Sequence, residues 1–406
     1  MTSRTAAVLL LAASLLACTT EVVCTTGQVT CNGQCTSLQS DAANCGACGR
    51  SCGPAQTCSL GICCQGDDCL PAVYAACFNT DSVQGATRLL VPIGAPVPVD
   101  DGPVSLAWQG ASLWVANNLS NTLDRMKVAA SGLLADGPFP TVKLAGTKFD
   151  LQFLAERDGL LYASNDAVGS LVVIDPAAAS PVLGEVMFGA FSYPQGIAFS
   201  GSKAYVALNG LSSIAVVDLA AWTVSKEIDL SSLASPGGFA LPTRMVVSGG
   251  RLYVTLWNLD VAYVPAGNGL LAVVDMSTDE LAPAPNPLDL GPACENPWGI
   301  ALLGGTAWVT CGFFPYTAKD ATEISGAAFV PVDVSGATPV VGAAAPATGT
   351  APGPIVFCNG NGYAGDRFSG DVLRFDPATG SITQRGLVCP AITGMSSYIP
   401  DLTCAR

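Results

Sequence analysis

The sequence predicts an all-β protein: a ring of seven four-stranded sheets (a seven-bladed β-propeller), preceded by a small disulfide-rich module. Three observations support this prediction. An aromatic residue within a short apolar stretch recurs at intervals of 40 to 55 residues along 72–406. Gly (44) and Pro (28) are abundant, as many short strands and tight turns require. Finally, 11 of the 17 cysteines fall between Cys24 and Cys77.

Composition limits the function. Half of the residues are apolar and only 12% are charged, so the chain can build a large core. The formal net charge is −14, so nucleic acid is not an expected partner, because phosphate binding needs a basic surface. There is no histidine, which removes Ser-His-Asp and Cys-His catalysis, His-ligated metals and c-type haem attachment. Carboxylate, Lys or Tyr chemistry and an all-oxygen Ca²⁺ site remain open.

The N-terminus has the pattern of an export signal. Arg4 provides a positive charge, and an apolar run of twelve residues follows over 6–17. Such a run is too short to span a bilayer but has the size of a signal-peptide core. No later segment has the pattern of a transmembrane helix.

The end of this run, Leu15-Leu16-Ala17-Cys18, resembles the lipobox of bacterial lipoproteins. The resemblance implies a signal peptide over 1–17, a diacylated Cys18 as the mature N-terminus and a tether over 18–23. Thr19 stands where that family carries its Asp retention signal, which implies an outer-membrane location on a side that stays open. The alternative is an ordinary secretory signal with an incidental cysteine.

Cysteine spacing defines a module over 24–69. Asn44-Cys45-Gly46-Ala47-Cys48-Gly49-Arg50-Ser51-Cys52 resembles the stigma-specific-protein-type repeat N-C-G-x-C-G-x-x-C, common in exported myxobacterial proteins. The resemblance identifies a module and no activity. Cys45, Cys48 and Cys52 could ligate an iron–sulfur cluster or zinc, but export to an oxidising compartment favours disulfides. Setting Cys18 aside leaves 16 cysteines, an even number, and the pairing within the module stays open.

One pattern recurs over residues 70–406. A short strand with an aromatic is followed by a Val/Ile-rich strand that ends in Asp, as in Leu252-Tyr253-Val254-Thr255 and Leu271-Ala272-Val273-Val274-Asp275. The aromatics are Tyr74, Trp114, Tyr162, Tyr205, Tyr253, Trp308 and Tyr363. Periods of this length built from short strands predict propeller blades. The copies resemble the YVTN/NHL-type propellers.

Two further positions keep register with the aromatics. A proline precedes the innermost strand at Pro103, Pro194, Pro242, Pro297 and Pro352. An aspartate closes the third strand at Asp175, Asp218, Asp275, Asp333 and Asp376. We expect the aspartates to cap turns, with Ca²⁺ ligation as the alternative, and the aromatics to be core residues between blades.

The ring is expected to close through a composite blade made of 72–100 and 390–400. Cys294 and Cys311 in one blade occupy the same blade positions as Cys389 and Cys77 in the composite blade. We therefore predict disulfides Cys294–Cys311 and Cys77–Cys389. Cys358 and Cys404 could pair on the opposite face, and Cys64–Cys69 would then complete the set.

A ligand is expected at the mouth of the central channel, on the face that carries the loops into the first strand and out of the second. Arg244 stands where two other blades have Gly196 and Gly299, so it would point a cation into the channel. The other candidates are Asn117, Asn118, Asn165, Asp166, Asn209, Trp257, Asn258, Glu295, Asn296 and Trp298. They suit a sugar, peptide or anion, whereas the alternative is that Asn serves turns and Trp packs between blades.

Three functions follow. The first is a non-catalytic binding or scaffold lipoprotein, monomeric, without cofactor or metal, with a protein, peptide or carbohydrate ligand. The second is a metal-dependent propeller hydrolase similar to the gluconolactonases, which need no histidine. Streptogramin-lyase-like propellers are also similar in fold, but their chemistry uses histidine. The third is a structural component of the envelope. No catalytic constellation is recognisable, so we expect no enzymatic activity.

Overall fold

The computed structural model describes residues 24–405, except for 26, 60, 130–133, 135–140, 145–149, 316 and 391–397. The expected signal peptide and Cys18 therefore lie outside the described residues. The chain divides into two compact units, Met1–Gln65 and Gly66–Arg406, a few residues before the boundary expected at 69. Within the described ranges, no helix is both long and apolar enough to cross a membrane.

The first unit is held together by disulfides. Its strands form two hairpins, β1 (Val29–Cys31) with β2 (Gln34–Thr36) and β3 (Thr57–Ser59) with β4 (Ile62–Cys64). The disulfides are Cys24–Cys35, Cys31–Cys48, Cys45–Cys58 and Cys52–Cys63. The sulfurs of Cys45, Cys52 and Cys63 lie within 4.8 Å of one another, yet each already forms a disulfide. The structure therefore has disulfides here rather than the thiolates that iron–sulfur or zinc ligation requires.

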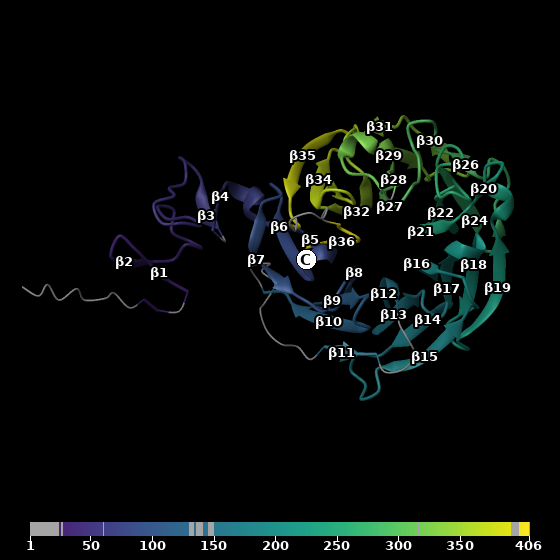
Figure 1. The fold of residues 1–406 in the computed structure, drawn as a ribbon, viewed down its shortest axis with the longest axis horizontal. Coiled ribbons are helices and arrows are strands. Elements are labelled where there is room, and N and C mark those ends of the chain that lie inside the picture. The colour runs from purple at the N-terminus through teal and green to yellow at the C-terminus, as the bar shows by residue number, and fades with distance from the viewer. Residues whose placement is uncertain are drawn as a thin grey trace, which may run out of the picture. The chain divides into compact units, whose positions relative to one another are not determined.

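The second unit is a seven-bladed propeller, and we number its blades along the chain, naming the innermost strand first (Figure 1). Blade 1 contains β36 (Leu402–Cys404), β5 (Pro71–Cys77), β6 (Ser82–Thr87) and β7 (Pro92–Pro98). Blade 2 contains β8 (Pro103–Gln109), β9 (Ser112–Asn117), β10 (Thr122–Lys127) and β11 (Val142–Lys143). Blade 3 contains β12 (Leu151–Arg157), β13 (Leu160–Asn165), β14 (Ser170–Ile174) and β15 (Val182–Met187). Blade 4 contains β16 (Pro194–Ser200), β17 (Lys203–Leu208), β18 (Ser213–Asp218) and β19 (Thr223–Asp229).

In blades 5 and 6, two short strands share the outer position. Blade 5 contains β21 (Pro242–Ser248), β22 (Arg251–Leu256), β24 (Leu270–Asp275), β25 (Glu280–Leu281) and β26 (Leu288–Asp289). Blade 6 contains β27 (Ile300–Leu303), β28 (Thr306–Phe313), β29 (Ser325–Asp333), β30 (Val340–Val341) and β31 (Ala345–Pro346). Blade 7 contains β32 (Pro352–Cys358), β33 (Asn361–Asp366), β34 (Asp371–Phe375) and β35 (Ile382–Leu387). Five single 3₁₀ turns are η1 (Gly66–Cys69), η2 (Phe78–Thr80), η3 (Asn209–Leu211), η4 (Ser231–Leu233) and η5 (Ala321–Glu323).

The innermost strands close the ring. They contact one another in the order β8, β12, β16, β21, β27, β32 and β36, and β36 returns to β8. Strand β36 pairs antiparallel with β5, so the C-terminus supplies the missing strand of blade 1. This strand begins at Leu402, later than the interval 390–400 expected from the sequence. Asp401 accepts hydrogen bonds from Ser105 and Leu106 of β8, which holds the chain at the ring's end before the strand starts.

Three disulfides brace the ring. Cys77–Cys389 joins β5 to the segment that follows blade 7, and Cys358–Cys404 joins β32 to β36. Cys294–Cys311 lies within blade 6. These are the pairs that the blade register suggested, and Cys64 and Cys69 are also disulfide-bonded. The seam of the propeller therefore has two covalent links.

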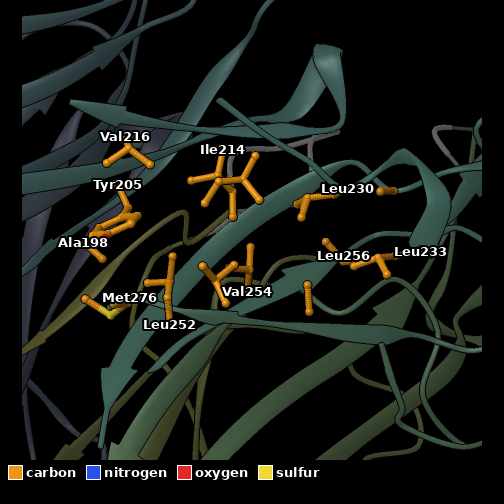
Figure 2. Close-up of a cluster of buried hydrophobic side chains, with 14 of the residues drawn as sticks. Ala198, Tyr205, Ile214, Val216, Leu230, Leu233, Leu252, Val254, Leu256 and Met276 are labelled. Carbon is orange, nitrogen blue, oxygen red and sulfur yellow. The ribbon is translucent and has the colours of Figure 1, made fainter. Parts of the chain in front are cut away.

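The recurring aromatics form the core between blades, as expected. All seven are buried, with 4% or less of the side chain exposed. Between blades 4 and 5, Tyr205 packs among Val216, Leu252 and Val254 (Figure 2). Its hydroxyl donates a 2.5 Å hydrogen bond to Asp279 in the next blade. Burial of such rings is the main source of blade cohesion.

The closing aspartates cap turns. In each of the five copies, the carboxylate accepts a hydrogen bond of 2.8 to 2.9 Å from the backbone N–H two residues later. The prolines also stand where they were expected: four open innermost strands, and Pro297 precedes β27. The prolines therefore mark the start of the innermost strand, and the aspartates mark the turn after the third strand.

Blades differ mainly in the connection from the second to the third strand. In blades 1, 2, 3, 4 and 7 it has four residues, as in 118–121 and 166–169. In blade 5 it spans 257–269 and in blade 6 it spans 314–324. Part of the blade 5 connection forms β23 (Leu259–Asp260), which pairs with β20 (Gly238–Phe239). Long connections at one place on a regular scaffold indicate a functional elaboration.

Candidate functional site

The site lies at the end of the ring where the long connections emerge. We call it the axial cluster, and it consists of Arg244, Trp257, Trp298, Arg367, Tyr398 and Asp401. These residues come from β21, the connections after β22 and β33, the approach to β27 and the approach to β36. The sequence predicted the first three of them at this mouth.

Arg367 lies between aromatic rings. Its guanidinium carbon is 4.5 Å from the centroid of Trp298 and 5.1 Å from that of Phe314. Trp298 in turn stacks on Trp257, with centroids 5.1 Å apart. A Cβ atom on Gly353 would come within 2.4 Å of the Arg367 side chain, so only glycine leaves room for it. The cation is therefore held in one position by packing.

Arg367 has one hydrogen bond and one free donor. It donates through Nη2 to the carbonyl of Gly312, whereas its Nε has no partner. Burial lowers the pKa of Arg367 to about 10, partly opposed by Tyr398 and Asp366. It remains a cation at neutral pH.

The side chain of Arg244 extends from β21 of blade 5 to Phe153 in β12 of blade 3. Its backbone N–H donates to Thr255 at 3.0 Å, and its guanidinium carbon lies 4.4 Å from the ring of Phe153. Its Nη1 is shielded from solvent and has no hydrogen-bond partner. Burial lowers the pKa of Arg244, and the nearby Asp401 and Tyr398 oppose that shift.

Tyr398 and Asp401 come from the C-terminal segment. Burial raises the pKa of Asp401. The charge of Arg244 and the hydrogen bonds donated by Leu106 and Ser105 oppose this rise. Burial also raises the pKa of Tyr398, against Arg367 and Arg244. Arg244 therefore faces the Asp401 carboxylate, which is already bonded to β8, whereas the carboxylate that acts on Arg367 is Asp366.

Four donors of the axial cluster have no acceptor among the described residues. They are Arg244 Nη1, Arg367 Nε, Trp257 Nε1 and Trp298 Nε1. All four can only donate, and buried polar groups are rarely left unpaired in native proteins. Such a set lacks an acceptor, and an anion is the chemical species that supplies one.

The opposite side of the mouth, on blades 2 and 3, is rich in acceptors. Asp150 accepts from Asn118 and, at 2.7 Å, from Gln152. Asp166 accepts from Gln195 at 3.3 Å. Burial, and then repulsion from Asp150, raise the pKa of Asp166 to about 8. Burial likewise raises the pKa of Asp150. At neutral pH Asp166 is therefore mostly protonated and carries little charge.

Several predicted ligand-binding asparagines serve the fold instead. Asn117 donates to Thr122 and Asp124, and Asn165 accepts from the N–H groups of 150 and 167. Asn258 ties the blade 5 connection to Ser235 and Asn268. All three are fully buried. Asn117 and Asn165 end their second strands and Asn258 lies two residues beyond its own, and their amides bond to neighbouring backbone and side chains, so we assign these residues to the fold rather than to the site.

The remaining candidates lie apart from the cluster or beside it. Asn209 donates to the carbonyl of Pro242 at 3.2 Å and lines a pocket between blades 4 and 5. Glu295 accepts a hydrogen bond from Ser325, the first residue of β29, so its carboxylate is used within blade 6. Asn296, two residues before Trp298, has a buried Oδ1 without a partner.

Sequence reasoning missed Arg367, Tyr398 and Asp401. Tyr398 falls within the strand expected over 390–400, whereas the innermost strand of blade 1 is β36, which begins at Leu402. A signal for Arg367 was present: it is one of only 17 cations, and it follows Asp366 at the end of a second strand. The residue after that strand, rather than the residue that ends it, faces the ring axis in this blade.

Comparisons with known proteins support the two-part architecture. Residues 8–66 match the model of the stigma-specific STIG1-like protein family. No curated protein matches the chain. Among solved structures, it is similar to a Lactobacillus plantarum protein (12% identity, TM-score 0.60, covering 83% of this chain and 99% of that one). A Bacteroides uniformis protein provisionally assigned as a 6-phosphogluconolactonase is also similar (13%, 0.59, 82% and 99%). So is a streptogramin B lyase (15%, 0.54, 77% and 87%). Identities this low show the propeller fold alone.

Proposed function

We propose that this chain is an exported binding lipoprotein of the outer membrane. A diacylated Cys18 anchors it, the disulfide module over 24–69 links the anchor to the propeller, and the axial cluster binds a small ligand that carries a carboxylate. The protein acts as a monomer and leaves the ligand chemically unchanged.

One observation supports the ligand class most strongly: the four donors of the axial cluster that have no acceptor. A carboxylate supplies up to four lone-pair sites and matches a guanidinium in geometry. Arg367 is already held between Trp298 and Phe314, so little side-chain entropy is lost on binding. Trp257 and Trp298 provide apolar area beside the charged group.

The same residues disfavour a metal-dependent hydrolase at this position. A divalent cation needs several oxygen ligands, whereas the axial cluster presents two guanidinium groups that repel a cation. In the part of the chain that the structure describes, the one grouping of three metal-ligating residue types is the disulfide-bonded Cys45, Cys52 and Cys63. The observations therefore favour binding over metal-assisted hydrolysis.

Calorimetric titration of the full chain in detergent tests the ligand class. The probes are D-glucuronate, its neutral counterpart D-glucose, and acetyl-Ala-Ala with a free or an amidated C-terminus. We expect saturable binding of a probe with a carboxylate and none of its neutral counterpart. The responding acid separates an acidic sugar from a peptide terminus, whereas equal binding of the charged and neutral forms would contradict the proposal.

Metabolic labelling with palmitate tests the anchor separately. The wild-type chain should take up label and fractionate with outer membranes. Cys18→Ser should abolish both, and Cys64→Ser, a matched cysteine variant outside the signal, should keep its label. An unlabelled wild-type chain would show that Cys18 is not lipidated, and would leave the ligand proposal standing.

A further inference from the structure

A second feature of the propeller lies between blades 4 and 5, on the elaborated side of the ring. It is a pocket of about 330 Å³. Its lining residues are Phe191, Tyr193, Asn209, Gly210, Phe239, Leu241, Asp260, Val261 and Tyr263. One wall is the extra sheet of β20 and β23, which the other blades do not have. We call it the aromatic pocket.

Large apolar side chains at this pocket are exposed to an unusual degree. Phe191 is 74% exposed and Tyr263 66%, and Tyr193 and Phe239 are also exposed. The recurring aromatics of the seven blades are instead buried. A cluster of exposed rings around a concavity marks a binding site rather than scattered surface residues.

The backbone holds these rings at a conformational cost. Phe191 has φ +63°, Tyr193 +44° and Tyr263 +57°, a region that bulky residues rarely adopt. Hydrogen bonds fix the first two: Asn209 N–H donates to the Tyr193 carbonyl, and Gly210 N–H to that of Ser192. A Cβ on Gly210 would come within 2.0 Å of the Phe191 carbonyl oxygen. Strain that surrounding contacts impose is typical of functional sites.

The polar groups of the pocket define what it can bind. The lining contains one carboxylate, Asp260, and no cation. Asp260 Oδ1 accepts from the N–H groups of Ala262 and Val264, which leaves Oδ2 for a ligand donor. The hydroxyls of Tyr193 and Tyr263 make no hydrogen bond with a described residue. An anionic ligand is therefore disfavoured, and a ligand with several hydroxyl groups is favoured.

We infer that the aromatic pocket is a binding site for a neutral saccharide. Sugar rings present C–H faces that pack on aromatic faces, and hydroxyl groups that donate to a carboxylate and exchange hydrogen bonds with phenols. A volume of about 330 Å³ suits one or two sugar rings. A purely apolar protein segment would leave Asp260 and the phenols desolvated without partners, which costs affinity. This site is independent of the axial cluster.

Saturation-transfer difference NMR on the full chain tests this inference. The probes are maltotriose, cellotriose and chitotriose, with acetyl-Trp-amide as an aromatic peptide mimic and glucuronate as the ligand of the other site. We expect saturable transfer to the ring C–H protons of at least one trisaccharide. Glucuronate should not displace it, since it binds at the axial cluster.

The variants separate the aromatic faces from the polar groups. Tyr263→Ala and Phe191→Ala, both at exposed positions, should each lower trisaccharide affinity by about threefold to tenfold. Tyr193→Phe, which removes one hydroxyl, and Asp260→Asn, which keeps the Oδ1 acceptor, should also lower it. Met187→Ala, at an exposed apolar position on the outer strand of blade 3, should leave it unchanged.

Three results would overturn the inference. One is the absence of transfer to every trisaccharide, with glucuronate still binding, which would leave the proposed function intact. A second is displacement of a bound trisaccharide by glucuronate, or loss of trisaccharide binding in Arg367→Met. Either result would place the trisaccharide at the axial cluster. Transfer to acetyl-Trp-amide alone, lost in Tyr263→Ala, would reassign the pocket to an aromatic peptide and also contradict the inference.

Discussion

The two sides of the propeller mouth are built on the same blade framework, yet they differ in which buried polar atoms lack a hydrogen-bond partner. On blades 2 and 3, the connections have four residues, and the acceptors Asn117 Oδ1 and Asp166 Oδ1 are buried without a partner. On blades 5 and 6, the connections are long, and the donors Trp257 Nε1 and Trp298 Nε1 are buried without a partner. The side with short connections therefore leaves acceptors unpaired, whereas the side with long connections also leaves donors unpaired.

The largest expected effect is the loss of stability on removing the disulfide Cys77–Cys389, which closes the ring that carries both sides of the mouth. Replacing Cys77 and Cys389 together with Ser opens a covalent loop with a separation of 312 residues. In the loop-entropy model this lowers the free energy of unfolding by about 6 kcal/mol. Denaturant unfolding of both proteins measures the difference. Replacing Cys294 and Cys311, which close a loop of 17 residues, is the comparison and should cost about 3 kcal/mol. Equal losses would mean that the length of the closed loop does not determine how much the disulfide stabilises the fold.

Next in size is the loss of the buried cation on the donor side. Arg367→Met keeps the length of the side chain and removes its charge and donors, so binding of a carboxylate probe should weaken by about 2 kcal/mol. Calorimetry with the responding acid measures this change. Gln152→Met, on the acceptor side, is the matched control and should bind as the wild type does. A larger loss in the Gln152 variant would move the anion site to blades 2 and 3.

A smaller effect concerns pH and the acceptor side. The pKa of Asp166 in the folded state is raised to about 8, above its unfolded value near 3.8. Between these values the folded state holds a proton that the unfolded state has released, so stability falls as pH rises from about 4 to about 8. Thermal unfolding at several pH values should show this fall. Asp166→Asn should flatten it and raise Tm at pH 8, and an unchanged profile would show that Asp166 titrates normally.

The smallest expected effect is that of a chelator. EDTA should leave Tm and probe binding unchanged, because the proposal involves no metal on either side. A fall in Tm, reversed by Ca²⁺, would indicate a bound ion that stabilises the fold. It would also reopen the hydrolase alternative and the Ca²⁺ role that the sequence leaves open for the closing aspartates.

Most of the fold could be predicted because each blade repeats the same short sequence pattern of strands and turns. The buried aromatics, such as Tyr205, and the capping aspartates, such as Asp275, are short-range patterns that tertiary contacts do not override. The site could be predicted only in part. Arg244 was found because it replaces a glycine at an equivalent position, but the pairing of Arg367 with Trp298 and Phe314 joins distant parts of the chain. Sequence register cannot show such a contact.

The asparagines illustrate the same limit. Asn117 and Asn165 end their second strands, and Asn258 lies two residues beyond its own. Polar residues at a mouth suggest ligand contacts. Whether an amide bonds to its own turn or faces the axis depends on side-chain direction at the strand end. The strand pattern does not encode that direction, and these three bond to their turns.

Resonances of the indole N–H groups test the central claim most directly. The chain has six Trp residues, and single Trp→Phe variants assign their signals in a ¹⁵N–¹H spectrum of the full chain. The account predicts that the carboxylate probe shifts the signals of Trp257 and Trp298 saturably, while its neutral counterpart does not. Unshifted signals for both residues at a saturating probe concentration, or equal shifts with the neutral counterpart, would contradict it.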